Sequence, residues 1–167
     1  MEYQLEVAGY NKESIVDGKG IRYTVFMQGC PHHCVGCHNP ATHPFTGGTV
    51  ADIDEIASEV ILNPLIKGIT LSGGEPFSQA KALIPLVNKI RASNKDVWAY
   101  SGYTYEQLNS GICEASQELL GLVDVLVDGK FELEKRDLTL FFRGSSNQRV
   151  IDCNQTRNQG KIILLDL

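Results

Sequence analysis

Apolar residues along this chain fall into short runs typical of β-strands, separated by longer segments with helical spacing. Residues 21–27 (IRYTVFM) are β-branched and aromatic, which favours a buried strand. Residues 28–48 carry turn formers and no sustained period, so we expect a long loop, and long loops in compact domains commonly serve function. The pattern predicts further strands at 67–72, 96–101, 123–128, 148–152 and 161–166.

The spacing of the remaining apolar residues predicts helices, at 52–62, 79–92 and 113–121 and from Thr104 onward. Asp52 with Glu55 forms a capping pattern at the start of the first of these helices. Ser78 is expected to cap the second helix, although Pro85 lies inside it. Strands and helices therefore alternate at intervals that suit crossover connections, which predicts a parallel sheet with helices over its faces.

Ligands of such folds bind where the strands end, at their carboxyl termini. Four segments directly follow predicted strands and are therefore expected to line one rim: the loop from residue 28, and residues 73–75, 101–103 and 128–130.

Length and charge narrow the class of protein. A chain of 167 residues fits one domain, 1–167, and is long enough to bury a core. The chain has 15 Lys and Arg residues and 20 Asp and Glu residues, which gives a net charge of −5. This charge argues against a protein that binds the nucleic-acid backbone. The most apolar long window, residues 60–71, is shorter than the roughly 20 residues of a spanning helix. We expect neither nucleic acid nor membrane as a partner, no signal peptide, and a cytoplasmic location.

Three of the five cysteines lie close together, as Cys30, Cys34 and Cys37. The cytoplasm keeps thiols reduced, so these cysteines are expected to be metal ligands or bystanders rather than disulfide partners. Thiolates are soft ligands that suit zinc and iron–sulfur clusters. The other two, Cys113 and Cys153, stand alone in the sequence and are expected to be small apolar residues.

Three interpretations of the cysteine segment remain open. The thiols are unligated, or they bind a structural zinc ion together with His32, His33 or His38, or they hold a 4Fe–4S cluster. Zinc sites usually take ligands from two separated knuckles, and the sequence contains no second knuckle. A 4Fe–4S cluster with three protein ligands would leave one iron open to a substrate or cofactor.

Further motifs connect the chain to a known superfamily. Cys-x₃-Cys-x₂-Cys after one strand, with Gly-Gly-Glu-Pro at 73–76 after the next, resembles the radical S-adenosylmethionine superfamily. The chain most resembles the anaerobic ribonucleoside-triphosphate reductase activating proteins, from about residue 5 to the C-terminus. The segments that narrow the resemblance are 14–22 (SIVDGKGIR), 28–32 (QGCPH), 37–40 (CHNP), 100–104 (YSGYT) and 128–131 (DGKF). Two positions depart from the wider pattern: Lys19 replaces a common Pro, and Gly36 replaces a common aromatic residue.

The resemblance implies an α/β fold, in which a single domain forms an open, partial (β/α) barrel with a mostly parallel sheet. It implies a 4Fe–4S cluster on Cys30, Cys34 and Cys37, with S-adenosylmethionine as cofactor and a reduced flavodoxin-type protein as electron donor. Reductive cleavage of the cofactor would then place a glycyl radical on anaerobic ribonucleoside-triphosphate reductase, the protein substrate.

The resemblance also implies which residues bind S-adenosylmethionine: Gly36, Cys37, His38, Gly73, Gly74, Glu75, Asp128 and Lys130. Glu75 would accept from the cofactor's ammonium group, Asp128 from its ribose hydroxyls, and Lys130 would meet its carboxylate. Arg143 and Arg149 are expected to contact the partner protein, and no side chain is expected to act as acid or base. The alternatives are another small radical enzyme (pyruvate formate-lyase activase-like or deazapurine synthase-like) and a non-catalytic iron–sulfur or zinc module.

Overall fold

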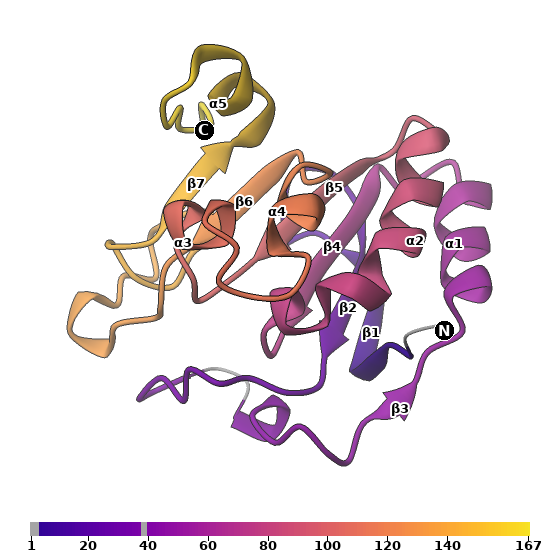
Figure 1. Cartoon of the computed structure of the whole chain (residues 1–167), viewed down its shortest axis with the longest axis horizontal. Coiled ribbons are helices and arrows are strands. Elements are labelled where there is room, and N and C mark those ends of the chain that lie inside the picture. Colours follow the sequence, from indigo (N-terminus) through magenta and orange to yellow (C-terminus); the bar gives the residue numbers. More distant parts are fainter. Residues whose placement is uncertain (1–3, 38–39) are drawn as a thin grey trace.

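The described residues of the computed structural model, 4–37 and 40–167, form one seven-stranded sheet in the order β3-β1-β2-β4-β5-β6-β7 (Figure 1). The four central strands, β2, β4, β5 and β6, are parallel, whereas β1, β3 and β7 are antiparallel to their neighbours. β3 and β7 are edge strands, so the sheet is not closed. The strands are β1 (Glu6–Ser14), β2 (Arg22–Met27), β3 (Thr49–Val50), β4 (Gly68–Gly73), β5 (Asp96–Tyr100), β6 (Val125–Asp128) and β7 (Arg149–Asp152).

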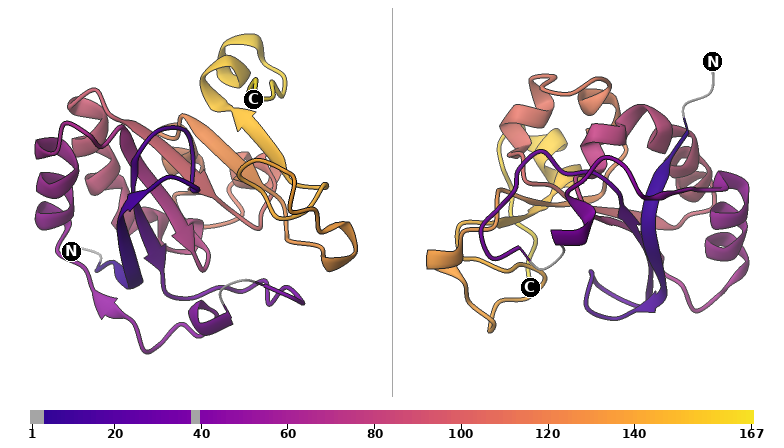
Figure 2. Two further views of the ribbon diagram at one scale, coloured as in Figure 1. Left: turned by 180° about the vertical axis from the view of Figure 1, so that it is seen from behind. Right: turned by 90° about the horizontal axis from the view of Figure 1, so that it is seen from below.

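Helices α1 to α4 cover one face of this sheet: they lie in front of it in Figure 1 and behind it in the left view of Figure 2. The main apolar core lies between sheet and helices and contains Tyr23, Val25 and Met27 of β2. The helices are α1 (Ile53–Leu62), α2 (Ala80–Ala92), α3 (Tyr105–Asn109), α4 (Ser116–Leu120) and α5 (Cys153–Gln159), with 3₁₀ turns η1 (Pro40–Thr42), η2 (Pro76–Gln79) and η3 (Leu133–Lys135).

The opposite face of the sheet carries a smaller apolar cluster around Trp98, Val125, Val127 and Val150. Side chains alternate along a strand, so Phe26 of β2 belongs to this second face, where it lines a cavity. The expectation of helices over both faces is therefore wrong, because loops rather than α1 to α4 border this side. An open parallel centre with helices on one face is the arrangement of a partial (β/α) barrel, so the predicted fold class is confirmed.

Loop 15–21 crosses this second face and is held there by buried polar contacts. The Thr70 hydroxyl donates to the Asp17 carbonyl, and Arg22 donates to the Lys19 carbonyl. Arg22 is fully buried, forms an ion pair with Asp96 at 2.5 Å, and lies against the Trp98 ring. Burial lowers the pKa of Arg22, and these acceptors offset the loss of hydration.

Local signals predicted the first helix and the short helix correctly. The Asp52 side chain accepts from the backbone N–H of Glu55, and Thr104 with Gln107 forms a capping box at α3. The expected Ser78 cap is wrong, because Ser78 lies inside η2, which Glu75 caps instead. Pro85 lies within α2 on its exposed side without ending the helix.

Other boundaries differ from the sequence prediction. The predicted helix 113–121 begins only at Ser116. The predicted strand 161–166 makes only an isolated bridge from Leu164 to Ile151. The strands β1 and β3 and the helix α5 were not predicted; in β1 most residues after Val7 are at least partly exposed, which obscures any apolar alternation. Among the described residues, no helix has the length and apolar character needed to cross a membrane.

Candidate functional site

A cavity of about 570 Å³ opens over the second face of the sheet, where the parallel strands end. This is the position predicted for ligands of a parallel sheet. The strand ends, the cysteine loop (described residues 28–37 and 40–44), loop 15–21 and the β6–β7 connection (residues 129–148) all contribute to its wall. The lining includes Cys30, Cys34, Cys37, Gly73, Gly74, Ser101, Gly102, Gly129 and Arg143. The expected common rim is therefore present.

The cysteine loop is closed at its neck by hydrogen bonds. The Gln28 side-chain amide donates to the carbonyls of Ala41 and Pro44, at 3.2 and 2.6 Å. The backbone N–H groups of Gly29 and Cys30 donate to the carbonyls of residues 42 and 43. These contacts hold the two ends of the loop together next to the end of β2. The closed loop carries its three thiols on the side of the cavity.

The three clustered thiols differ in burial. Cys30 is buried, whereas Cys34 and Cys37 are partly exposed. Burial raises the pKa of Cys30 and Cys34, while backbone N–H groups and, at Cys34, the Lys130 charge oppose that rise. Within residues 4–37 and 40–167, no three His, Cys, Asp or Glu side chains converge as they would around a single metal ion. Three thiolates of a 4Fe–4S cluster bind separate irons, so they need a shared cavity rather than a single point.

Gly36 supports the shape of the loop between Cys34 and Cys37. It has a φ of +77°, which disfavours other residues. A Cβ at this position would lie 2.9 Å from Leu133 and 3.3 Å from Phe131 of the β6–β7 connection. The small residue therefore lets that connection pack directly on the cysteine loop. His38, the adjacent predicted cofactor contact, lies outside the described residues.

Gly73 and Gly74 line the cavity but also pack against the start of the cysteine loop. A Cβ on Gly74 would lie 2.3 Å from the Gly29 carbonyl oxygen, and one on Gly73 would lie 2.5 Å from the Met27 nitrogen. The Glu75 N–H donates to that Gly29 carbonyl at 2.7 Å. Glycine is therefore required here for contact between two loops, in addition to any contact with a ligand.

Glu75 is fully buried, and protein groups already occupy both of its carboxylate oxygens. It accepts from His32 Nε2 at 2.6 Å, from the Ser101 hydroxyl at 2.9 Å, and from backbone N–H groups of Phe77 and Gly102. Its side chain is not among the cavity-lining groups. This geometry makes Glu75 a connector of loops, which differs from the expected contact with an ammonium group.

Asp128 and Arg149, which the sequence assigned to separate roles, bind each other. Asp128 is buried and accepts from two guanidinium nitrogens of Arg149 and from the Tyr105 N–H. Neither residue lines the cavity. Lys130 is exposed, and its charge acts on Cys34 across the site.

Arg143 does line the cavity. Its Nη1 donates to the Gln148 carbonyl at 2.7 Å, whereas its buried Nε has no hydrogen-bond partner among the described residues. The Nε2 atom of His43, on the cysteine loop, is likewise buried without such a partner. Orphaned polar atoms beside a cavity suit a polar ligand, since burying them unpaired is costly.

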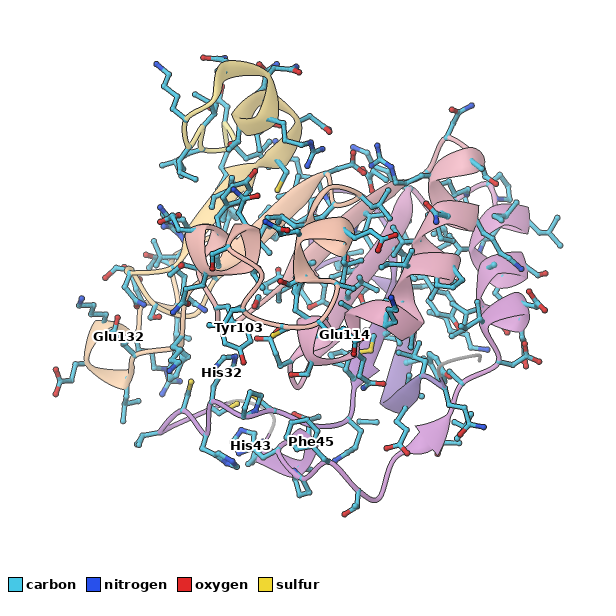
Figure 3. The ribbon with its side chains drawn as sticks, viewed as in Figure 1. His32, His43, Phe45, Tyr103, Glu114 and Glu132 are labelled. Atoms are coloured by element: carbon cyan, nitrogen blue, oxygen red, sulfur yellow. The ribbon has the colours of Figure 1, made fainter. Side chains whose placement is uncertain are left out.

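Sequence reasoning missed the part that Ser101, Gly102 and His32 play in joining the loops. The one available signal was the position of Ser101 and Gly102 at the end of a predicted strand. Figure 3 shows His32 pointing from the cysteine loop toward Tyr103, and their ring centroids lie 4.5 Å apart. Cys153 is a core residue, as predicted, whereas Cys113 is partly exposed and forms a hydrogen bond with Tyr103.

The fold and the three thiols define a class of iron–sulfur protein, and comparison with known families agrees. The family model described as a 4Fe-4S single cluster domain matches residues 16–151. The chain is 36% identical to the anaerobic ribonucleoside-triphosphate reductase-activating protein of Haemophilus influenzae over 83% of this chain and 92% of that protein. It is 39% identical to the protein of that name from Escherichia coli K12, over 84% and 94% of the two chains. The chain therefore belongs to the family of anaerobic ribonucleoside-triphosphate reductase-activating proteins.

Two further similarities were found. The protein of the same name from Enterobacteria phage T4 is 36% identical over 81% of this chain and 86% of its own. The crystal structure of QueE from Escherichia coli overlaps 60% of this chain and 53% of its own, with a TM-score of 0.49 and 15% identity.

Proposed function

We propose that this chain uses a 4Fe–4S cluster and S-adenosylmethionine to generate a glycyl radical on anaerobic ribonucleoside-triphosphate reductase. The observation that carries the proposal is the convergence of Cys30, Cys34 and Cys37 on one cavity, beside the glycines that end β4. Family membership supports the same activity, since the relatives are named as activators of that reductase.

The residues present fit this cofactor pair. Three soft thiol ligands suit an iron–sulfur cluster and leave one iron without a protein ligand. The neighbouring cavity of about 570 Å³ has the size of a small-molecule site. When bound, the pair supplies one-electron cleavage of the cofactor's sulfonium bond and removal of a hydrogen atom from a glycine.

The protein's own residues would bind and orient the cofactor. We propose that backbone groups from Gly36 to His38 meet the adenine, and that backbone at Gly73 and Gly74 meets the methionine end. Lys130 and Arg143 would supply positive charge for the carboxylate, and Arg143 lines the cavity with a buried Nε that has no hydrogen-bond partner among the described residues. We propose that Glu75 and Asp128 act through other residues, because protein donors already surround their carboxylates.

The electron donor, the exclusion of nucleic acid and membrane as partners, and the cellular location remain predictions. A reduced flavodoxin-type protein would supply the electron, and neither nucleic acid nor membrane is expected to take part. The net charge of −5 supports the exclusion of nucleic acid. We also propose a cytoplasmic location, where thiols are kept reduced.

The test is anaerobic reconstitution of the full chain with iron and sulfide, followed by incubation with reductant, S-adenosylmethionine and the reductase. We expect visible iron–sulfur absorbance, formation of 5′-deoxyadenosine, and a glycyl doublet in the electron paramagnetic resonance spectrum of the reductase. The doublet must be absent without S-adenosylmethionine and with Cys34→Ala. A colourless zinc protein would contradict the proposal, and so would cofactor cleavage driven by a small molecule but by no candidate reductase.

A further inference from the structure

The buried carboxylate of Glu75 joins three loops that are distant in sequence. His32 comes from the cysteine loop, Glu75 from the end of β4, and Ser101 with Gly102 from the end of β5. The contacts to Glu75 span 43 residues to His32 and 26 residues to Ser101. Because the carboxylate is fully buried, these donors replace its entire hydration.

The surroundings of His32 fix the position of its ring. Nε2 lies 2.6 Å from Glu75, the side chain is 5% exposed, and the ring packs against Tyr103 in a T-shaped arrangement. A Cβ on Gly102 would lie 2.4 Å from the ring, so only glycine admits the imidazole at this place. The ring is thus held on one side by a carboxylate and on two others by packing.

The backbone that carries this ring lies next to the first thiol. Burial raises the pKa of Cys30, and the backbone N–H groups of His32 and His33, which face the Cys30 sulfur as donors, oppose that rise. His33 has a φ of 48°, an uncommon conformation for a residue other than glycine. A fixed His32 ring therefore helps to hold a turn whose N–H groups face the sulfur.

We propose that His32, clamped by Glu75, is a positioning residue that keeps these two N–H groups directed at the Cys30 sulfur. The proposal rests on the cluster of the proposed function. Hydrogen bonds to cluster sulfurs stabilise the added negative charge of the reduced state and so raise the reduction potential. Loss of the His32–Glu75 contact should therefore make the cluster harder to reduce, even where the cluster still binds.

The experiment compares reconstituted full-length variants without reductase or S-adenosylmethionine. His32→Leu removes the donor, His32→Gln keeps an N–H donor of similar reach, and Glu75→Gln removes the carboxylate charge. Lys12→Met serves as the control, because it removes an exposed ion pair with Glu59 on another part of the surface. The measurements are iron and sulfide per chain and the midpoint potential from an anaerobic spectroscopic titration.

We expect His32→Leu to shift the potential to more negative values, His32→Gln to restore most of the shift, and Lys12→Met to leave it unchanged. The double variant His32→Leu/Glu75→Gln should shift the potential by less than the sum of the two single variants, because the two substitutions share the His32–Glu75 contact. An unchanged potential in His32→Leu at full iron content would overturn the proposal. If His32→Leu loses the cluster, retention of cluster and potential in His32→Gln supports the proposal, and loss in both contradicts it.

This outcome is separable from that of the proposed function. A cluster that shifts in potential as expected, in a chain that forms no glycyl radical, would refute the activity and leave the role of His32 intact. Formation of the glycyl radical, together with an unaltered potential in His32→Leu, would support the activity and refute the role of His32.

Discussion

Arg149 of β7 binds Asp128, its cross-strand neighbour in β6, with Nη2 at 2.5 Å from the carboxylate. The same nitrogen also reaches Glu106 of α3 at 2.7 Å. These carboxylates raise the pKa of the Arg149 guanidinium well above its ordinary value. The pair ties the last strand and a surface helix to the edge of the site, so Arg149 has a structural role that partner contact does not explain.

Arg149→Ala should destabilise the fold, because it leaves a buried carboxylate with one of its three donor contacts. We expect a loss of about 2–4 kcal/mol in the free energy of unfolding. Urea unfolding followed by circular dichroism measures this loss. Arg136→Ala, at an exposed arginine on the β6–β7 connection, is the control and should change stability by less than about 0.5 kcal/mol. Equal stability of the two variants would contradict the structural role of Arg149.

Each of Cys30, Cys34 and Cys37 should be necessary for the cluster, since all three line the cavity. Alanine at any of them should abolish most iron and sulfide binding after reconstitution. Cys113→Ala and Cys153→Ala should retain both, with Cys153→Ala somewhat less stable because that residue lies in the core. A loss of iron in Cys113→Ala as complete as in Cys34→Ala would indicate a four-cysteine site.

Gly74→Ala should impair cluster binding as well as cofactor binding. The added methyl group would meet the Gly29 carbonyl and displace the segment that carries Cys30. Gly9→Ala is the matched control, because a Cβ at Gly9 has nothing within 4 Å. Iron content and equilibrium binding of S-adenosylmethionine would be measured for both. Full iron content with lost cofactor binding in Gly74→Ala would show that the glycine serves the ligand alone.

Arg143→Ala should weaken binding of S-adenosylmethionine, because the Arg143 guanidinium lines the cavity. We expect about a tenfold loss of affinity, the size of one charge-assisted hydrogen bond. Arg136→Ala again provides the control. Equilibrium dialysis with the reconstituted chain measures the effect, and association with the reductase is measured in parallel. Unchanged cofactor affinity together with weaker association with the reductase would contradict this prediction and indicate that Arg143 contacts the partner protein.

Alkaline pH should destabilise the metal-free chain through its buried thiols. Burial raises the pKa of Cys153 from its ordinary value of 9.0 to about 12. The unfolded chain therefore loses this proton near pH 9 while the folded chain keeps it, so stability falls as pH rises from about 9 toward 12. This thiol alone contributes a slope of at most about 1.4 kcal/mol per pH unit. Urea unfolding at pH 8.5, 9.5 and 10.5 should show a shallower decline for Cys153→Ala, and parallel declines would exclude this thiol as a cause.

Local sequence features by themselves determined several elements and the chemistry of the site. The Asp52 cap of α1 and the Thr104 capping box of α3 depend on contacts three residues apart, which a sequence displays directly. The spacing of Cys30, Cys34 and Cys37 likewise places three soft ligands within one short loop. Such features need no knowledge of distant residues, because the interacting groups are neighbours along the chain.

Only the tertiary structure decided which polar side chains face the cavity. Glu75 follows β4 and Asp128 ends β6, where ligand-binding carboxylates are expected, yet donors 43 and 21 residues away occupy their oxygens. Those partners depend on which strands are neighbours and on the antiparallel direction of β7, and neither is visible in periodicity. A buried carboxylate must find donors wherever the fold brings them, so its role is set by the packing of distant segments.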